Sequence, residues 1–185
     1  LLVGCVGQSP TAPTQAAHNL VVGATLEPPT MNPSASPAAS IPQVLLYNVY
    51  ETLVRMDAEG KLNPLLAQTW DVSSDRTVYT FNLNPAAKFA SGKPVTAQAV
   101  ATSFNRIKTE AAISAPLVEQ MKVVKSTEAV DEHTVKVTLN HPSNLWLYDI
   151  SSTAGIIYDP DGIATIDTTP AGSGPYQLQQ WNRGQ

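Results

Sequence analysis

Residues 60–83 read GKLNPLLAQTWDVSSDRTVYTFNL, and this stretch decides the fold. In its second half Tyr79, Phe81 and Leu83 alternate with smaller or more polar residues, which is the period of two typical of a strand. Residues 73–75 (SSD) have the composition of a turn, so a hairpin is predicted here. Both faces of the strand carry substantial side chains, and we therefore expect it to be covered on each side.

Two more elements are predicted downstream of this strand. Thr96 has the residue type of a helix N-cap, and a buried helical stripe follows it. The stripe consists of Val100, Phe104 and Ile107. Residues 122–130 and 134–139 form a second predicted hairpin, in which Val135, Val137 and Leu139 share one face. The chain therefore pairs a helix with neighbouring strands.

The segments before residue 71 are predicted from shorter patterns. The apolar run 20–24 (LVVGA) predicts a buried strand. Ser40 and Gln43 have the spacing of a capping box, with Ser40 as N-cap of a helix. Ile41, Leu45, Val49 and Leu53 recur at helical spacing and would form its buried face. Residues 62–70 are predicted to be a short helix or a loop with apolar anchors.

The last part of the chain carries weaker signals. Residues 145–148 are an apolar stretch, residues 159–162 (DPDG) predict a tight turn, and residues 176–181 predict a final strand. Strands and helices mixed in this order indicate an α+β fold. No internal repeat is visible.

Composition limits the possible functions. The chain has 185 residues, of which 43% are hydrophobic and 14% charged, as in ordinary globular proteins. The length suits one domain, or one domain and a piece of another. The net charge is −4, and no run of Lys or Arg forms a stripe that would neutralise phosphates. We therefore expect no nucleic-acid partner.

The single cysteine lies close to the start of the chain, where residues 1–5 read LLVGC. Residues 2–5 look like a bacterial lipobox, so residues 1–5 are predicted to comprise the tail of a signal peptide, residues 1–4, and the lipidation site Cys5. Two acyl chains on Cys5 would suffice for stable anchoring. Residues 6–18 are small, polar and proline-containing, and we predict a flexible tether there. A lone cysteine excludes disulfides within the chain, and no apolar run reaches the roughly 20 residues needed to span a bilayer.

Several blocks of the sequence together resemble one known family. They are residues 50–54 (YETLV), 60–73 (GKLNPLLAQTWDVS), 79–83 (YTFNL), 88–97 (KFASGKPVTA) and 172–176 (GSGPY). In this order and approximate spacing they resemble the family 5 extracellular solute-binding proteins, which include the peptide-, dipeptide- and nickel-binding proteins of ABC transporters. Each block is weak alone, but chance rarely aligns all of them.

The chain departs from the family pattern at several positions. Gln98 and Ala99 stand where members commonly carry Glu-Asp, which leaves Thr96 as the only cap. Residues 82–85 replace the usual arginine-bearing turn, and Ser173 replaces threonine in the glycine turn. Members are also much longer, so we expect this chain to be an amino-terminal fragment.

The resemblance implies a fold and a division of the chain. The implied fold is that of a class II-like periplasmic binding protein of cluster C, of α/β type. Residues 19–47 and 168–185 would belong to a mixed-sheet first lobe, residues 48–167 would form an inserted extra subdomain, and the second lobe would be missing. Such proteins close two lobes on a ligand, so one lobe alone should bind it poorly.

The resemblance also indicates which segments line the ligand cleft. They are the loop 31–40, residues 113–117 and residues 151–155. The candidate cleft residues are Met31, Asn32, Ser34, Ser36, Ser40, Ile113, Ser151, Ser152, Thr153 and Gly155. Each segment has the alternative of being an ordinary surface loop or connection. Gly172-Ser173-Gly174 similarly suits an anion cradle, or a tight turn that needs the positive φ of glycine, and we favour the turn.

Enzyme chemistry has little support in the sequence. His18, His133 and His141 lack metal-ligand spacing, and no nucleophile-elbow or zinc-protease motif occurs. Asp159 and Asp161 lack the other ligands of a calcium loop. We therefore expect no catalytic residue, no metal and no cofactor. A secreted hydrolase is the remaining enzymatic alternative.

The expected function is extracytoplasmic capture of a peptide or similar small solute, which is handed to the permease of an ABC importer. The protein is expected to be a monomer that contacts the membrane only through lipidated Cys5. An alternative from another class is a surface lipoprotein that uses the same fold for sensing or adhesion. The residues do not choose among a dipeptide, a longer peptide, a metal chelate, a sugar or an opine.

Overall fold

The computed structural model describes residues 20–184. Its elements, in chain order, are α1 (Ser40–Leu45), β1 (Val54–Met56), β2 (Leu62–Pro64), β3 (Ala67–Val72), β4 (Val78–Leu83), α2 (Ala97–Thr109), α3 (Ala115–Met121), β5 (Val124–Ala129), β6 (Thr134–Leu139), α4 (Trp146–Asp149) and the 3₁₀ helices η1 (Thr153–Gly155) and η2 (Pro160–Thr165). Cys5, the predicted lipobox and the predicted tether lie outside the described residues.

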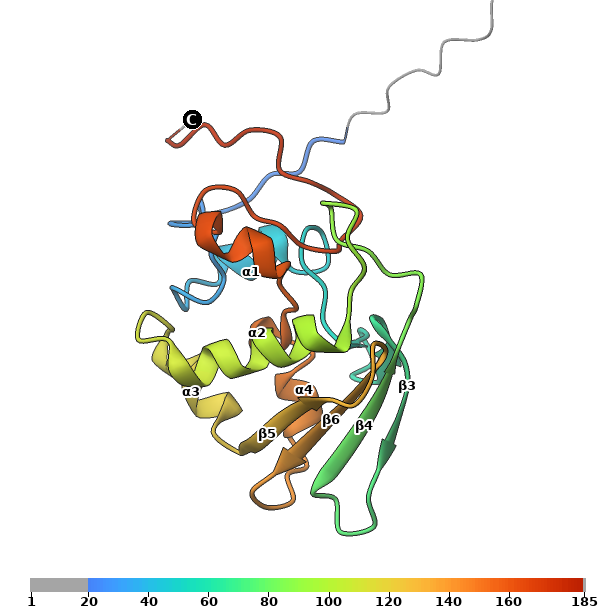
Figure 1. Ribbon diagram of the computed structural model, residues 1–185. Helices are drawn as coiled ribbons and strands as arrows, with labels where there is room; N and C mark the ends of the chain where they lie inside the picture. The colour runs from blue at the N-terminus through green and yellow to red at the C-terminus, as the bar shows by residue number, and fades with distance from the viewer. Residues whose placement is uncertain (1–19, 185) are drawn as a thin grey trace, which may run out of the picture.

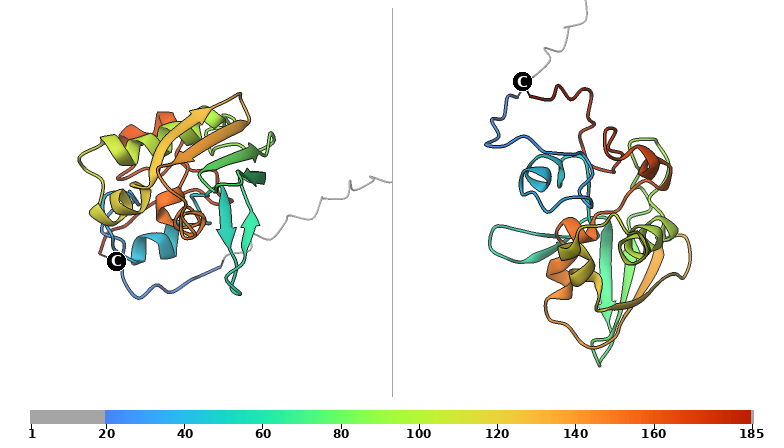
Figure 2. Two further views of the ribbon diagram at one scale, coloured as in Figure 1. Left: turned by 90° about the horizontal axis from the view of Figure 1, so that it is seen from below. Right: turned by 90° about the vertical axis from the view of Figure 1, so that its left-hand side faces the viewer.

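Two antiparallel sheets organise the strands. Strands β3, β4, β6 and β5 form a four-stranded sheet in that order, and β1 pairs with β2 in a separate hairpin. In the larger sheet Phe81 pairs with Trp70 on one side and with Val135 on the other. Helix α2 runs along one face of this sheet (Figure 1), and the β1–β2 hairpin stands away from it (Figure 2). Helices and antiparallel strands are thus mixed in one α+β unit, as predicted.

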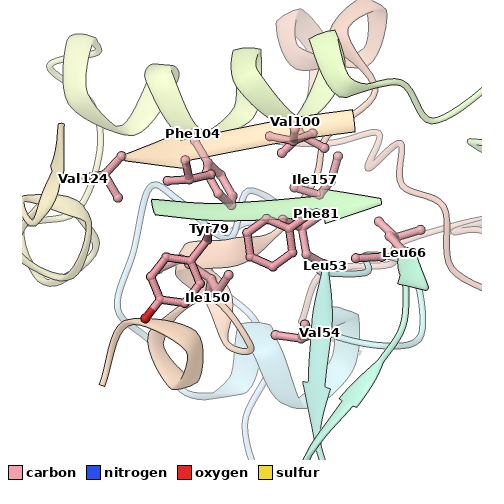
Figure 3. Close-up of a cluster of buried hydrophobic side chains, with 14 of the residues drawn as sticks. Leu53, Val54, Leu66, Tyr79, Phe81, Val100, Phe104, Val124, Ile150 and Ile157 are labelled. Carbon is pink, nitrogen blue, oxygen red and sulfur yellow. The ribbon is translucent and has the colours of Figure 1, made fainter. Parts of the chain in front are cut away.

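The main core lies between the four-stranded sheet and the helices over it. Phe81 is completely buried on the inner face of β4. Val100 and Phe104 of α2 pack into the same cluster, as Figure 3 shows. The ring of Trp146, from α4, lies 4.7 Å from that of Tyr79 and 6.0 Å from that of Phe81. The strands predicted at 78–83 and 134–139 and the helix predicted after Thr96 are all confirmed.

The outer face of β4 is not covered. Val78, Thr80 and Asn82 are half-exposed, whereas the residues between them are buried. Strand β6 repeats the pattern, because Lys136 on its outer face is half-exposed and pairs with Glu128 at 2.9 Å. The expectation that β4 is covered on both sides was therefore wrong. One buried face suffices in an antiparallel sheet, and the polar residues of the other face remain in water.

Thr96 caps α2 as predicted. Its Oγ1 accepts a hydrogen bond from the backbone N–H of Ala99 at 3.2 Å. The helix has no acidic residue in its first turn that would assist the cap. Thr96 therefore carries the N-terminal side-chain capping of α2 alone.

We expect Thr96→Ala to lower the free energy of unfolding by about 1 kcal/mol, because a first-turn N–H loses its acceptor. Urea denaturation of the chain measures the change. Thr109→Ala, at the other end of α2, is the matched control. Thr109 is exposed and donates only to the carbonyl of Asn105, so we expect a change within about 0.5 kcal/mol. Equal effects of the two substitutions would contradict the capping role.

The helix predicted after Ser40 begins and ends at other residues than expected. Ala39 is its N-cap, and Ser40 lies inside the first turn, where its Oγ donates to the carbonyl of Glu27 at 3.4 Å. No side-chain capping bond forms, so the predicted capping box is wrong. The helix ends at Leu45, and Tyr47 has a φ of 64°. Val49 and Leu53 are buried all the same, because the chain turns back onto the core.

Two strand predictions and one helix-or-loop prediction need correction. Residues 20–24 and 176–181 form no strand, and Val21 in the first segment is 92% exposed. A strand requires a ladder of hydrogen bonds with a neighbour. The N–H of Tyr176 donates to the carbonyl of Asn48 at 2.9 Å, but no described segment continues a ladder along either run. Residues 62–70, in contrast, contain β2 and the start of β3 in place of the predicted helix or loop. The backbone groups of β2 pair with β1, and those of β3 pair with β4. This pairing outweighs the helix or loop that the spacing of the apolar residues suggested.

A second, smaller apolar cluster joins the segments on either side of the main core. Met31 and Ile41 pack there with Ile156, Tyr158 and Ile166. The aromatic rings of Tyr50 and Tyr158 meet edge to face at 5.3 Å in this cluster. The loop after residue 30 is therefore held by the segment that follows η1. The division of the chain at residues 47 and 167 stays a prediction.

Candidate functional site

A groove forms where three segments far apart in the sequence meet. They are the loop before α1, the start of α3 and the segment that contains η1. The groove has a volume of about 160 Å³, and its lining residues are Pro33, Ser36, Pro37, Ala38, Pro42, Ser114, Pro116, Leu117, Gln120, Ser152 and Thr153. All three segments predicted to line the cleft contribute to it.

The first wall is a loop held by its own side chains. Oδ1 of Asn32 accepts hydrogen bonds from the backbone N–H of Ser34 at 3.0 Å and from its hydroxyl at 2.6 Å. Oγ of Ser36 accepts from the N–H of Ala38 at 3.2 Å. Pro33, Pro37 and Pro42 stiffen the same wall. The groove is therefore preformed on this side, which reduces the entropy lost when a ligand binds.

The second wall is the short helix α3. The backbone N–H of Ser114, just before the helix, donates to the carbonyl of Ser34 at 2.8 Å and joins the two walls. Gln120 lines the groove, and its amide donates to Asp149 Oδ1 at 3.3 Å. Burial raises the pKa of Asp149, and the hydrogen bond from Gln120 opposes that shift. Asp149 thereby orients the amide of Gln120 at the groove.

The third wall is the turn between α4 and η1. Its two serine hydroxyls donate to carbonyls of the preceding turn, Ser151 to Tyr148 at 2.8 Å and Ser152 to Asp149 at 2.6 Å. The hydroxyl of Tyr47 donates to the carbonyl of Ser151 and ties this turn to the chain after α1. Thr153 faces the groove beside Ser152. The hydroxyl oxygens of this wall can accept hydrogen bonds from a ligand.

Gly155 closes the turn for a steric reason. A Cβ at this position would lie 1.8 Å from the carbonyl oxygen of Ile150. No side chain fits there unless the backbone moves. Gly155 therefore acts on the groove through the shape of the turn.

We expect Gly155→Ala to lower the free energy of unfolding by more than about 3 kcal/mol, because the clash is with backbone. Thermal and urea unfolding measure the loss. Gly23→Ala is the matched control, because a Cβ on Gly23 would meet nothing within 4 Å. Its effect should stay within about 0.5 kcal/mol. A Gly155→Ala protein as stable as this control would contradict the packing role.

The ten candidate cleft residues occupy two kinds of position. Three line the groove, namely Ser36, Ser152 and Thr153. The other seven are buried residues that pack or hydrogen-bond inside the protein: Met31, Asn32, Ser34, Ser40, Ile113, Ser151 and Gly155. The structure brings their segments together, while ligand contact by any of them remains a prediction. The seven buried residues lie beneath the lining residues and hold the walls in place.

Two lining residues lie outside the predicted segments. Pro42 belongs to the first turn of α1, and Gln120 belongs to α3. Helix α3 was not predicted, because its apolar residues Leu117 and Met121 form too short a stripe. The sequence signal that could have indicated it is Ser114 followed by Pro116, a serine at the N-cap position with proline in the first turn.

The electrostatics of the groove are neutral. Among the described residues that line it, none is charged; the polar ones are hydroxyls and one carboxamide. Such groups suit the uncharged polar parts of a ligand, such as amides and hydroxyls. A charged group of a ligand would need its partner elsewhere, because an unpaired charge is costly to remove from water.

The glycines of the turn 172–174 are required for a different reason than predicted. Neither glycine has a positive φ, so that part of the prediction is wrong. A Cβ would lie 2.0 Å from the carbonyl oxygen of Val49 at Gly172, and 2.4 Å from that of Asn48 at Gly174. The N–H of Gly174 donates to the carbonyl of Val49 at 3.0 Å. Glycine is required here by close contact between two backbone segments.

Residues 20–184 contain neither a cluster of metal ligands nor a helix able to cross a bilayer. No group of three or more His, Cys, Asp and Glu residues in this range is placed to hold a metal ion. Among the helices of the same range, none has both the length and the apolar character that crossing a bilayer requires.

Comparison with known proteins identifies the family. Residues 61–185 match the family described as bacterial extracellular solute-binding proteins, family 5, middle part. The chain is 33% identical over 181 residues to the probable D,D-dipeptide-binding periplasmic protein DdpA of Escherichia coli K12. The aligned region covers 90% of this chain and 34% of DdpA. The chain belongs to the family 5 solute-binding proteins, a family of binding proteins and not of enzymes.

Solved structures agree with this membership. The binding protein AgaA from A. tumefaciens R10, in complex with agropinic acid, has a TM-score of 0.78 at 30% identity, over 85% of this chain and 32% of AgaA. DppA from Helicobacter pylori, in complex with the peptide STSA, has a TM-score of 0.72 at 28% identity, over 83% of this chain and 35% of DppA. The chain thus has a periplasmic-binding-protein fold and spans about a third of the length of these relatives.

Proposed function

We propose that this chain is part of an extracytoplasmic solute-binding protein that captures a peptide or a similar small solute for an ABC importer. The groove built by three distant segments carries the proposal, together with family membership. Of the relatives named above, DdpA is a probable D,D-dipeptide-binding protein, DppA is in complex with the peptide STSA, and AgaA is in complex with agropinic acid. The expected partners are the solute and the permease subunits, and the protein is expected to act as a monomer.

The size of the groove supports a ligand site with two sides. Ligand pockets usually have volumes of roughly 300–1,000 Å³. The groove of about 160 Å³ receives only part of a peptide or of a similar ligand. We therefore propose that residues outside this chain supply an opposing lobe, and that the ligand stabilises the closed state because it contacts both lobes. In this scheme residues 19–47 and 168–185 belong to the first lobe, and residues 48–167 form the inserted subdomain.

The chemistry of the groove favours recognition of a ligand's uncharged backbone. Ser36, Ser152 and Thr153 offer hydroxyls, and Gln120 offers a carboxamide. These groups can donate to and accept from peptide amides without selecting side chains. Water in such a groove can bridge ligand and protein where direct contacts are missing.

We expect Thr153→Trp to fill the groove and to weaken binding at least about tenfold. Thr153 suits this test because it lines the groove and its side chain is only half-buried, so the change mainly removes space. Calorimetry on the intact gene product, with the peptide STSA, D-alanyl-D-alanine and agropinic acid as probes, measures the affinity. Ser74→Trp, in the exposed turn before β4, is the matched control and should bind like wild type.

Two outcomes would contradict this proposal. One is wild-type affinity in Thr153→Trp for a probe that the unmodified protein binds. The other is that no probe binds and that mass spectrometry finds no small molecule co-purified with the intact gene product. Weaker binding in Ser74→Trp as well would show a global effect.

The proposal includes a lipid anchor at Cys5 and an extracytoplasmic location. We expect Cys5→Ser to abolish incorporation of labelled palmitate and to release the protein from the membrane fraction, because serine offers no thiol for the diacylglycerol thioether. Metabolic labelling and fractionation of cells that express the intact gene product measure both effects. Ser9→Ala, four residues further along, is the control and should keep the label. Labelling that survives Cys5→Ser would contradict the anchor.

A further inference from the structure

A buried arginine lies behind the groove. Arg106 of α2 is 8% exposed, and only it and Asp159 are buried charged residues in the part of the chain that the structure describes. It lies where α2, the loop 31–36 and the segment around Tyr158 meet. A guanidinium buried in this way needs partners for its charge and its donors.

Three segments provide these partners. Nη1 of Arg106 donates to Oγ of Ser34 at 2.9 Å. Nε lies 2.7 Å from Oε2 of Glu110, the residue that follows α2, in an ion pair without the geometry of a hydrogen bond. The guanidinium carbon lies 5.3 Å from the centre of the Tyr158 ring, in a cation–π contact. Arg106 thus joins α2 to the first wall of the groove.

Ser34 is hydrogen-bonded to Arg106 and to both the first and the second wall of the groove. Its hydroxyl accepts from Arg106 and donates to Asn32 Oδ1, which holds the loop in its turn. Its carbonyl accepts from the backbone N–H of Ser114 at 2.8 Å, at the start of α3. Pro33 and Ser114 themselves line the groove. The position of Ser34 therefore determines how far apart the two walls stand.

We propose that Arg106 is a positioning residue for the ligand groove, because it fixes Ser34 and thereby the spacing of the loop 31–36 and α3. Arg106 itself does not line the groove, so it acts through Ser34. This inference rests on the proposed function for its effect on affinity. Its structural part, the spacing of the walls, can be measured without a ligand.

The main test is Arg106→Lys in the intact gene product. Lysine keeps the charge but loses the planar fork that reaches Ser34 and Glu110 together. Ser34→Ala is a second variant, which removes the acceptor of the Nη1 hydrogen bond and leaves Arg106 in place. Lys108→Met is the matched control. Lys108 is on the same helix, but its Nζ donates to the carbonyls of Val124 and Lys125, away from the groove.

Two readouts separate positioning from general stability. Hydrogen exchange at the amide of Ser114 reports the contact between the walls, and calorimetry reports the affinity for whichever of STSA, D-alanyl-D-alanine and agropinic acid binds the unmodified protein. We expect exchange at Ser114 to become at least about tenfold faster, and binding about tenfold weaker, in Arg106→Lys and Ser34→Ala. Lys108→Met should change neither the exchange rate at Ser114 nor the affinity, even where it lowers the melting temperature as much as Arg106→Lys and Ser34→Ala do.

The outcomes are distinct. Unchanged protection of Ser114 in both variants would overturn the inference, whatever happens to stability. Unchanged affinity with faster exchange would also overturn it, because the wall spacing would then not matter for the ligand. If no probe binds the unmodified protein and no small molecule co-purifies with it, the proposed function fails, and the exchange rate of Ser114 alone still decides whether Arg106 sets the wall spacing.

Discussion

The apolar face of β4 and β6 has to be covered, and the rest of the structure follows from the way α2 covers it. Phe81 and Val135 lie side by side on that face, and Phe104 packs against it from the helix. Burial of such side chains is the main favourable term in folding. Once α2 lies across the sheet, its buried flank at Ser103 and Arg106 faces the segment around Tyr158 and the loop before α1. The position of Arg106 and Ser103 at that surface is thus a consequence of core packing.

The same helix connects the core to the groove. Ser103 donates to the carbonyl of Ala99, and its oxygen accepts from the N–H of Tyr158 at 3.0 Å, which holds the segment after η1. Arg106 holds the loop 31–36 one turn later. One rigid element therefore holds the first wall and the segment that follows the third wall. Sites built on such elements are more precise than sites carried by free loops.

The described residues that line the groove carry no charge and its volume is small, and both properties limit the ligand contacts that this part of the protein can make. Hydroxyls and one carboxamide line it, and no charge is offered among its described lining residues. Selectivity for a charged ligand would then come from the opposing lobe that we propose, while this wall would contribute contacts common to many ligands. Tolerance toward different side chains is a natural result of such a division.

The sequence by itself determined the elements whose own residues carry the signal. The alternation of Tyr79, Phe81 and Leu83, the cap at Thr96 and the hairpin of β5 and β6 depend on local periodicity and on backbone groups nearby, and they were predicted. The family resemblance also indicated the three segments that meet at the groove, and their contact with a ligand stays a prediction. Only the tertiary structure decided that the apolar run at 20–24 has no strand partner, that Val49 and Leu53 leave the helix of α1, and that Gly155 and Gly172 are needed for close backbone contact. Those outcomes depend on what a residue meets across the fold, and a pairing between Arg106 and Ser34, 72 positions apart, leaves no local pattern in the chain.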